Sequence, residues 1–143
     1  MTDRRVPHNP DAEAALISAC LLYTDRRREA LATLDPDDLY VAANRRVYAA
    51  IARLETRGEP VDIITVAAEV HTGDGRAGID PAVVAGYLNS LGAAVNSAAY
   101  ARIVADMARY RRLLHAADEL AEAVYAFDDT AIDQALKAIT EAA

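Results

Sequence analysis

Two short patterns contain residue types that bind phosphates or metals, and the first is glycine-rich. Residues 73–78 read GDGRAG, which matches the G-x-G-x-x-G spacing with which a backbone loop approaches a pyrophosphate. That chemistry requires a strand before the glycines and a helix directly after them. Here a helical pattern precedes the glycines, and Asp80-Pro81 opens the next helix. We therefore interpret this segment as a loop without a nucleotide.

The second pattern places His115, Glu119 and Glu122 on one face of a helix, at i, i+4 and i+7. A carboxylate-bridged metal in a helical bundle takes a Glu-x-x-His pair from each of two helices and further carboxylates from two others. The sequence contains no second pair of this kind, which favours a solvated helix face. We assign no catalytic and no metal-ligating residue, because no Ser-His-Asp or Cys-His arrangement has a local signature either.

The phosphate-binding pattern G-x-x-x-x-G-K-[ST] is absent from the sequence. Lys137, the only lysine, does not follow a glycine. ATP hydrolysis of the P-loop type therefore cannot come from these residues, and we expect no cofactor and no enzymatic activity in this chain.

The composition indicates a single domain with at most an appendage, which at 143 residues is long enough to bury a core. The one cysteine, Cys20, cannot form an internal disulfide, and we expect it to be buried on the apolar side of the first helix. No stretch approaches the roughly 20 apolar residues of a membrane span. The N-terminal residues MTDRRVPHNPD contain no apolar segment typical of a signal peptide. We expect a cytoplasmic protein without a membrane partner.

The net charge of −7 argues against a chain that grips a phosphate backbone by itself. Three arginine clusters occur nevertheless, and we interpret them mainly as solvated helix faces: Arg26-Arg27-Arg28, Arg45-Arg46, and Arg109 with Arg111-Arg112. The third cluster lies on a helix that we expect to meet partners, where it is suited to an acidic surface. A small helical nucleic-acid-binding protein that uses these clusters remains an alternative.

The patterning predicts an all-α fold with a compact multi-helix domain at the N-terminal end. Asn9, Thr24, Asp62 and Asp80 are the predicted N-caps of four helices, and Gly58 ends the helix before Asp62. We expect the second helix to span about Asp25 to Leu34, and the helix after Asp80 to stop at Gly92. The third helix should bury one apolar face, which consists of Tyr40, Val47, Tyr48, Ile51 and Leu54.

The longest element should begin with Ser97 as N-cap, because no glycine or proline interrupts the chain from there to Asp128. Its apolar residues repeat with alternating spacings of three and four, as in a heptad seam: Tyr100, Ile103, Met107, Tyr110, Leu114, Ala117, Ala121 and Val124. A last helix carries Ile132, Ala135, Leu136 and Ile139 on one side. The two helices read as an antiparallel hairpin over residues 96–143, after a globular part over residues 1–95, and its second arm is about half as long as the first.

One helix cannot hide a heptad seam by itself, and the short second arm covers only part of it. Either the globular part covers the rest, or the hairpin meets another subunit or partner; the pattern alone leaves both readings open. For the second reading, the candidate interface residues are Tyr100, Ile103, Met107, Tyr110, Leu114, Leu136 and Ile139.

Several motifs in order resemble the N-terminal domain of DnaB-type replicative helicases. The most specific are the turns Pro36-Asp37-Asp38-Leu39-Tyr40 and Gly58-Glu59-Pro60-Val61-Asp62. Asn44 is a departure, because the family often has His there. The resemblance covers roughly residues 7 to 125 and also rests on Pro7-His8-Asn9, Ala12, Glu13, Ala14, Leu16, Ile17, Leu21, Thr65, Tyr87-Leu88, Leu91, Ser97-Ala98-Ala99, Tyr100, Ile103 and Val104.

The resemblance implies an assembly and docking module that contains none of the helicase chemistry. It implies a ring of N-terminal domains, built from dimers that meet through their hairpins, which stabilises a hexamer and recruits primase through the primase C-terminal domain. ATP and Mg would belong to a C-terminal motor domain, and contact with DNA would be indirect. A stand-alone adaptor of phage or mobile-element type, which docks onto helicase or primase, is the alternative within this reading. We expect the hairpin rather than the globular part to carry the interface.

Overall fold

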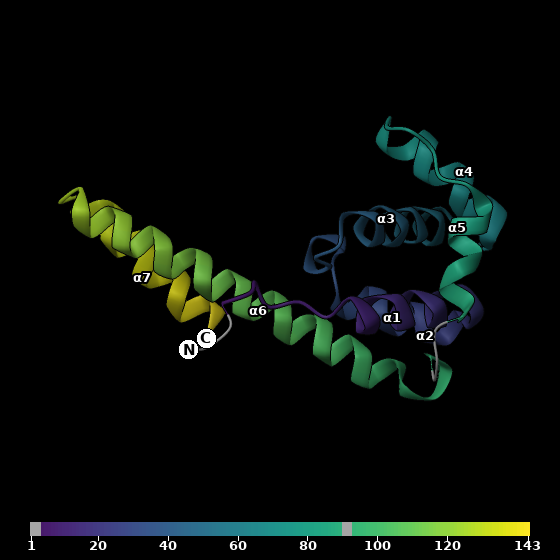
Figure 1. Cartoon of the computed structure of the whole chain (residues 1–143), viewed down its shortest axis with the longest axis horizontal. Coiled ribbons are helices and arrows are strands. Elements are labelled where there is room, and N and C mark those ends of the chain that lie inside the picture. Colours follow the sequence, from purple (N-terminus) through teal and green to yellow (C-terminus); the bar gives the residue numbers. More distant parts are fainter. Residues whose placement is uncertain (1–3, 90–92) are drawn as a thin grey trace. The chain divides into compact units, whose positions relative to one another are not determined.

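The computed structural model describes residues 4–89 and 93–143, and every regular element within these ranges is helical (Figure 1). The all-α prediction is therefore confirmed. The elements in chain order are α1 (Pro10–Leu22), α2 (Thr24–Thr33), the 3-10 turn η1 (Pro36–Asp38), α3 (Ala42–Arg57), α4 (Ile63–Asp74), α5 (Pro81–Gly86), the 3-10 turn η2 (Tyr87–Asn89), α6 (Ala93–Tyr125) and α7 (Asp129–Ala142).

The chain divides into two compact units, and α6 belongs to both. The globular unit, Asn9–Ala105, holds α1 to α5 and the first part of α6. The hairpin unit consists of Asp106–Ala143 together with the N-terminal residues up to His8. The boundary drawn from the sequence lay between residues 95 and 96, whereas the units meet between residues 105 and 106. The difference arises because Ser97 and Val104 of α6 are buried with the globular unit.

Apolar side chains from α1, α3 and α4 form the core of the globular unit, where amphipathic helices turn their stripes toward one another. Tyr48 of α3 is fully buried, and its hydroxyl donates to the Leu34 carbonyl over 2.9 Å, which ties α3 to the end of α2. Cys20 is buried as predicted, and burial raises the pKa of its thiol to about 12. The core includes Leu16, Ile17, Cys20, Leu39, Val47, Tyr48, Ile51, Leu54, Val66, Val70, Val84 and Val104.

The helix ends confirm most of the predicted caps. The Asn9 side chain accepts from the Ala12 N–H over 3.0 Å at the start of α1. Asp62 accepts from the Thr65 N–H over 2.8 Å and forms a reciprocal capping box with it. Asp80 caps α5, and Gly58 ends α3 with φ +70°, a conformation that glycine adopts without steric cost.

Three of the predicted positions are wrong. Thr24 is the first residue of α2 rather than its cap, because the Tyr23 carbonyl accepts the first helical hydrogen bond, from the Arg27 N–H over 2.9 Å. Ser97 lies inside α6, which begins at Ala93, since the alanine-rich residues before it continue the helix. Tyr40 precedes α3 and is 39% exposed, so it does not belong to the buried face.

The element after Asp80 differs from the predicted single helix. Its α-helical part ends at Gly86, and a 3-10 turn follows over Tyr87–Asn89. The predicted stop at Gly92, and Leu91 before it, lie outside the described residues.

A buried carboxylate on α1 caps the N-terminus of α3. Val41, the N-cap residue of α3, has no side-chain cap bond. Instead the Glu13 carboxylate, which is 1% exposed, accepts from the N–H groups of Tyr40 (2.9 Å) and Val41 (3.2 Å) and from the Asn44 amide (3.0 Å). The Tyr87 hydroxyl donates to the Asn44 carbonyl oxygen over 2.7 Å, and burial with the nearby charge of Glu13 raises the pKa of Tyr87 to about 12. This network joins α1, α3 and η2, and negative charge is favourable at a helix N-terminus.

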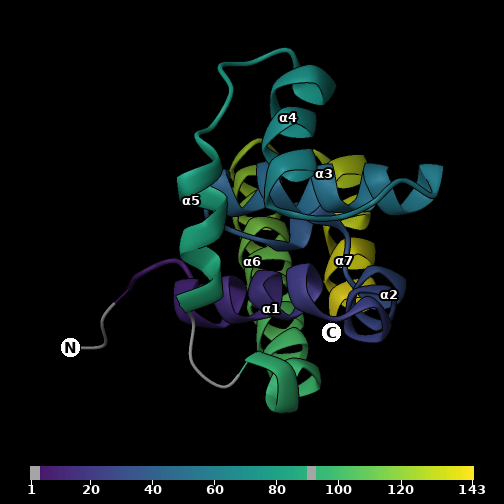
Figure 2. The same cartoon turned by 90° about the vertical axis from the view of Figure 1, so that its right-hand side faces the viewer.

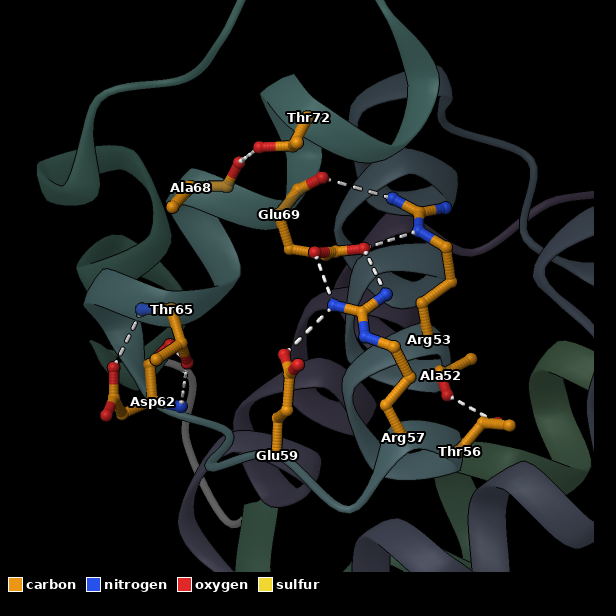
Figure 3. A network of polar contacts seen from close by, with 10 residues as sticks. All are labelled: Ala52, Arg53, Thr56, Arg57, Glu59, Asp62, Thr65, Ala68, Glu69 and Thr72. Atoms are coloured by element: carbon orange, nitrogen blue, oxygen red, sulfur yellow. Dashed lines mark hydrogen bonds and ion pairs between the residues drawn. The ribbon is translucent and has the colours of Figure 1, made fainter.

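A second network joins α3 to α4 and is centred on Glu69 (Figure 3). Arg57 donates to both Glu69 carboxylate oxygens, over 3.0 and 2.7 Å, and Arg53 donates to one of them over 2.9 Å. These hydrogen bonds, the strongest from Arg57, lower the pKa of Glu69 to about 2. Arg57 also pairs with Glu59 in the turn between the two helices, so the turn and both helices are held by one cluster.

Candidate interaction surface

The hairpin turn satisfies the backbone groups at the end of α6 in the manner of a Schellman motif. The Asp128 N–H donates to the Ala123 carbonyl over 3.0 Å, and the Phe127 N–H donates to the Val124 carbonyl over 3.2 Å. The Asp128 carboxylate then accepts from the Ala131 N–H over 3.0 Å and caps α7. The reversal of the chain is thus fixed by hydrogen bonds within nine residues.

Phe127 occupies the position of this motif that usually holds glycine. Its φ is +53°, in the left-handed region that costs a side chain with a Cβ about 1–2 kcal/mol. The ring is 91% exposed, and the nearby Tyr125 is 84% exposed. We call Tyr125, Phe127, Asp128 and Asp129 the hairpin tip. The sequence marked this segment only as a break between helices, although an aromatic residue at a helix C-terminus that requires positive φ is an unusual choice.

The two arms, α6 and α7, lie side by side in both views (Figure 1 and Figure 2). Ala116 and Ala123 of α6 and Ala135 of α7 are each at most 5% exposed. Positions 116 and 123 are seven residues apart, so they lie on the same side of α6. This alanine face, rather than the heptad seam, is the side of α6 that the second arm covers.

The large residues of the seam lie on another side of α6. Leu114 is two positions from Ala116, and residues two apart point to nearly opposite sides of a helix. Tyr110, Leu114 and Val124 are 41%, 49% and 52% exposed. The expectation that the second arm covers part of the seam is therefore wrong for these positions, because α7 packs on the alanine face.

The remaining predicted interface residues fall into two groups. Tyr100 and Ile103 belong to the globular unit, are half-buried against its core, and line a shallow groove of about 450 Å³ beside α1. Met107 and Ile139 belong to the hairpin unit and are half-buried, and Leu136 is 48% exposed. The structure thus does not gather all seven residues within one compact unit.

Negative charge is concentrated in the far part of the hairpin. Residues 113–143 contain seven carboxylates and one lysine, which accounts for six of the net seven negative charges of the chain. The basic residues of α6 lie before this region. Arg111 donates to the Pro7 carbonyl over 2.8 Å, and the Arg109 guanidinium lies 5.0 Å from the centre of the Tyr110 ring. The charge along α6 therefore changes from basic to acidic toward the hairpin tip.

The first two arginine clusters are largely engaged within the globular unit and are not simple solvated faces. Arg27 is 8% exposed and donates to the Glu55 carboxylate over 2.9 Å and to the Cys20 carbonyl over 3.0 Å. Arg28 pairs with the same carboxylate over 2.7 Å. In the second cluster, Arg45 donates to backbone carbonyls at the start of α3. These ion pairs between helices could not be read from sequence spacing, because the partners lie far apart in the chain.

The glycine-rich segment is a loop from Gly75 onward, whereas Gly73 and Asp74 are the last residues of α4 rather than part of the predicted loop. α4 runs to Asp74, and Gly75 ends it with φ +68°. Arg46 donates to the two Asp74 carboxylate oxygens over 2.7 and 3.2 Å and to the Ala77 carbonyl over 2.6 Å. The hydrogen bond from Arg46 is the main cause that lowers the pKa of Asp74 to about 2. The loop is thus held by an arginine of α3, with no strand before the glycines.

His115 lies 3.0 Å from the Glu119 carboxylate, and both side chains are more than half exposed, which agrees with a solvated helix face. Across residues 4–89 and 93–143, no group of three or more histidine, cysteine or carboxylate side chains is arranged to hold a metal ion. Within the same residues, no helix is both long enough and apolar enough to cross a membrane.

Comparison with known proteins relates this chain to replicative helicases. The family model of the DnaB-like helicase N terminal domain matches residues 5–106. The chain is 33% identical to the replicative DNA helicase DnaC of Bacillus subtilis and 34% identical to the replicative DNA helicase DnaB of Geobacillus stearothermophilus, with 100% and 98% of the chain aligned. Each alignment covers 32% of the helicase, so the chain spans about a third of the length of these curated relatives.

A solved structure extends the likeness to the arrangement of the helices. The crystal structure of the N-terminal domain of DnaB helicase from Mycobacterium tuberculosis superimposes with a TM-score of 0.86 at 32% sequence identity. The match covers 96% of this chain and 99% of that domain, so it includes the hairpin as well as the globular unit. Both kinds of comparison agree with the order of motifs along the sequence, and the chain belongs to the DnaB-like helicase N-terminal domain family.

Proposed function

We propose that this chain is a non-catalytic assembly and docking module of a hexameric replicative helicase. In this role it associates with further copies through the exposed seam on α6. The resulting ring of N-terminal domains, the collar, recruits the C-terminal domain of primase. The observation that carries the proposal is the exposed seam: Tyr110, Leu114 and Val124 are each about half exposed although α7 packs on the same helix. An apolar face of this kind is typical of a surface that meets a partner.

The charge gradient along α6 favours an antiparallel arrangement of two copies. In an isologous contact the same patch is used on both subunits, so the basic start of the seam on one copy meets the acidic far end on the other. Arg109 then lies near the carboxylates at Asp118 and Glu122, whereas a parallel arrangement places like charges together. Charge complementarity of this sort sets orientation and register more than it sets affinity.

The proposed role in a replicative helicase rests on the family, and the proposed lack of catalysis rests on the missing P-loop pattern in this sequence. The relatives are named replicative DNA helicases, and this chain aligns with about a third of their length. ATP and Mg binding are assigned to a motor domain outside the aligned region. Contact with DNA is indirect in this proposal, because the first two arginine clusters are engaged in ion pairs and the hairpin is acidic.

A charge placed in the seam tests self-association. We expect Leu114→Asp to raise the dissociation constant of the self-associated chain at least about tenfold, because a buried leucine is worth roughly 1.5–3 kcal/mol and 1.4 kcal/mol is a factor of ten. Leu22→Asp is the matched control: Leu22 has the same side chain, is 51% exposed and lies at the end of α1. Light-scattering mass across a dilution series distinguishes the two variants. Equal masses for parent and Leu114→Asp chains would refute the seam as an interface.

A second measurement tests the docking partner. The purified chain is mixed with the C-terminal domain of primase from the same organism, and the mass of the complex is recorded. Uptake of the primase domain by a dimer or larger species supports the collar. A chain that ignores primase but binds an intact replicative helicase in trans would instead support a stand-alone adaptor.

A further inference from the structure

The hairpin tip and a groove on the globular unit carry opposite charges, and neither includes residues of the seam. The groove lies between α1, α2 and the first part of α6 and has a volume of about 260 Å³. Its floor is apolar, with Leu16, Ala30 and Ala101 among the lining residues, and its rim carries Arg26, Arg102, Glu29 and Thr33. This volume is below the range of about 300–1,000 Å³ typical of small-molecule sites, and it suits one or two side chains.

The tip has the properties of an anchor for such a groove. Phe127 is 91% exposed although an aromatic ring that becomes buried removes about 150–250 Å² from water. It also holds a left-handed backbone conformation in which glycine would be free of steric cost. An exposed aromatic ring on a backbone position that favours glycine is typical of a side chain with a role outside the stability of its own fold.

The charges at the two sites are opposite. Asp128 and Asp129 directly follow Phe127 at the tip. Arg102 stands at the rim of the groove and has no hydrogen-bond or ion-pair partner among residues 4–89 and 93–143, and the Asp129 side chain has none there either. Arg26 is the second cation at the rim and pairs with Glu29 over 3.3 Å. The rim therefore carries one net positive charge, and the tip carries two negative charges.

We infer that the hairpin tip of one copy inserts into the α1–α2–α6 groove of a second copy, with the Phe127 ring on the apolar floor and Asp129 paired with Arg102. The contact is heterologous, because it joins two different surfaces of the chain, and such contacts generate rings when the rotation closes. An isologous seam interface alone ends at a dimer, so this second contact links dimers into larger species. It uses none of the seam residues and does not depend on primase.

Disulfide trapping tests the contact directly. One population of the chain carries Phe127→Cys and another, with a mass tag, carries Ala98→Cys, a substitution at an exposed position of the groove. The native Cys20 is buried and contributes little thiolate, because burial raises its pKa to about 12. Mixing under oxidised glutathione should yield the crosslink between the two populations at least about tenfold more than either control pair, as adjacent sites reach millimolar effective concentration.

The control pairs keep the same chemistry at other sites. Gln134→Cys replaces the tip cysteine at an exposed position of α7 that is not among the candidate interface residues. Ile64→Cys replaces the groove cysteine on the exposed side of α4. Equal yields for the tip–groove pair and the controls would overturn the inference. A crosslink that forms only within one chain, when both substitutions are placed in it, would overturn it as well.

Oligomeric mass provides the second readout. Phe127→Gly removes the ring and relieves the backbone, so it should remain folded. We expect it to raise at least about tenfold the concentration at which species larger than a dimer form. Arg102→Asp and Asp129→Arg should each have the same effect, and the double variant should regain assembly, whereas Arg4→Glu at an exposed N-terminal position should not matter.

The seam and the tip are distinguishable in these experiments. Leu114→Asp should lose the dimer and still give the tip–groove crosslink, whereas Phe127→Gly should keep the dimer. A Phe127→Gly chain that forms large species at the same concentration as the parent would refute the tip contact and leave the seam proposal standing.

Discussion

The Glu13 network gives a quantitative test of how α1 and α3 are joined. Replacing Glu13 by glutamine keeps the size of the side chain but turns one carboxylate oxygen into a donor. Three donors now converge on that carboxylate: the Tyr40 and Val41 N–H groups and the Asn44 amide. In the variant one acceptor oxygen remains, and the new NH₂ group meets a donor, so at least one buried donor loses its partner.

The expected cost follows from the strength of these bonds. Hydrogen bonds to a charged group are worth about 1.5–3 kcal/mol each, and an unsatisfied buried polar group costs about 1–3 kcal/mol. We therefore expect Glu13→Gln to lower the free energy of unfolding by about 2–3 kcal/mol. Tyr87→Phe removes only the outermost hydrogen bond of the network, the one to Asn44, and should cost about 0.5–1.5 kcal/mol.

Urea unfolding followed by circular dichroism measures the change in unfolding free energy for both variants. An unchanged slope of the unfolding free energy against urea concentration indicates that only the stability has changed. Hydrogen exchange adds a local readout, because the amides of Tyr40 and Val41 should lose protection in Glu13→Gln while the amide of Thr65, in another capping box, should not. Glu141→Gln is the control, since the Glu141 side chain is 69% exposed near the end of α7. A change below about 0.5 kcal/mol in Glu13→Gln, the range of ordinary surface substitutions, would refute the assigned role.

Three further predictions concern stability. The folded-state pKa of Glu69 and of Asp74 is about 2, below the ordinary values of 4.5 and 3.8, so the stability that these carboxylates contribute is complete above about pH 4.5 and is lost as the pH falls toward 2. The urea concentration at the unfolding midpoint should therefore fall over this pH range, and it should fall less in Glu69→Gln. Ser18→Ala should raise the free energy of unfolding by about 1 kcal/mol, because the buried Ser18 hydroxyl has no hydrogen-bond partner within the described part of the chain; a loss of stability would contradict this account. Ile51→Ala should lower it by about 2–5 kcal/mol, whereas the same change at the 65% exposed Ile64 should cost much less, as urea unfolding of both variants would show.

The sequence predicted the features that depend on near neighbours. Asn9, Asp62 and Asp80 cap helices through N–H groups two or three residues away, and Gly58 ends α3 because only the local backbone decides that position. The family likeness likewise rested on short turns. Contacts of this kind are made within a few residues of the chain, so spacing found these, although it misplaced the caps at Thr24 and Ser97.

The features that the sequence did not predict depend on distant partners. The Glu13 carboxylate accepts hydrogen bonds from residues 27 to 31 positions further along the chain, and Arg27 pairs with Glu55 across 28 positions. At the interaction surface, heptad spacing correctly identified an apolar stripe on α6 but not which stripe α7 would cover. An alanine-rich helix offers a second face for close packing, and only the three-dimensional pairing of the two arms decides between the two faces.

That choice of face links the stability of the hairpin to its proposed role. An alanine side chain buries one methyl group, worth about 0.8 kcal/mol, whereas a leucine is worth roughly 1.5–3 kcal/mol. By holding the arms together through Ala116, Ala123 and Ala135, the hairpin leaves its larger side chains, such as Leu114, partly in water. The alanine face therefore contributes less apolar stabilisation to the contact between the arms than a face of larger side chains would, and in the proposed assembly further apolar stabilisation is gained when another copy covers the seam. Since anything that binds the folded form alone stabilises it, assembly and the folding of the hairpin are coupled in this arrangement.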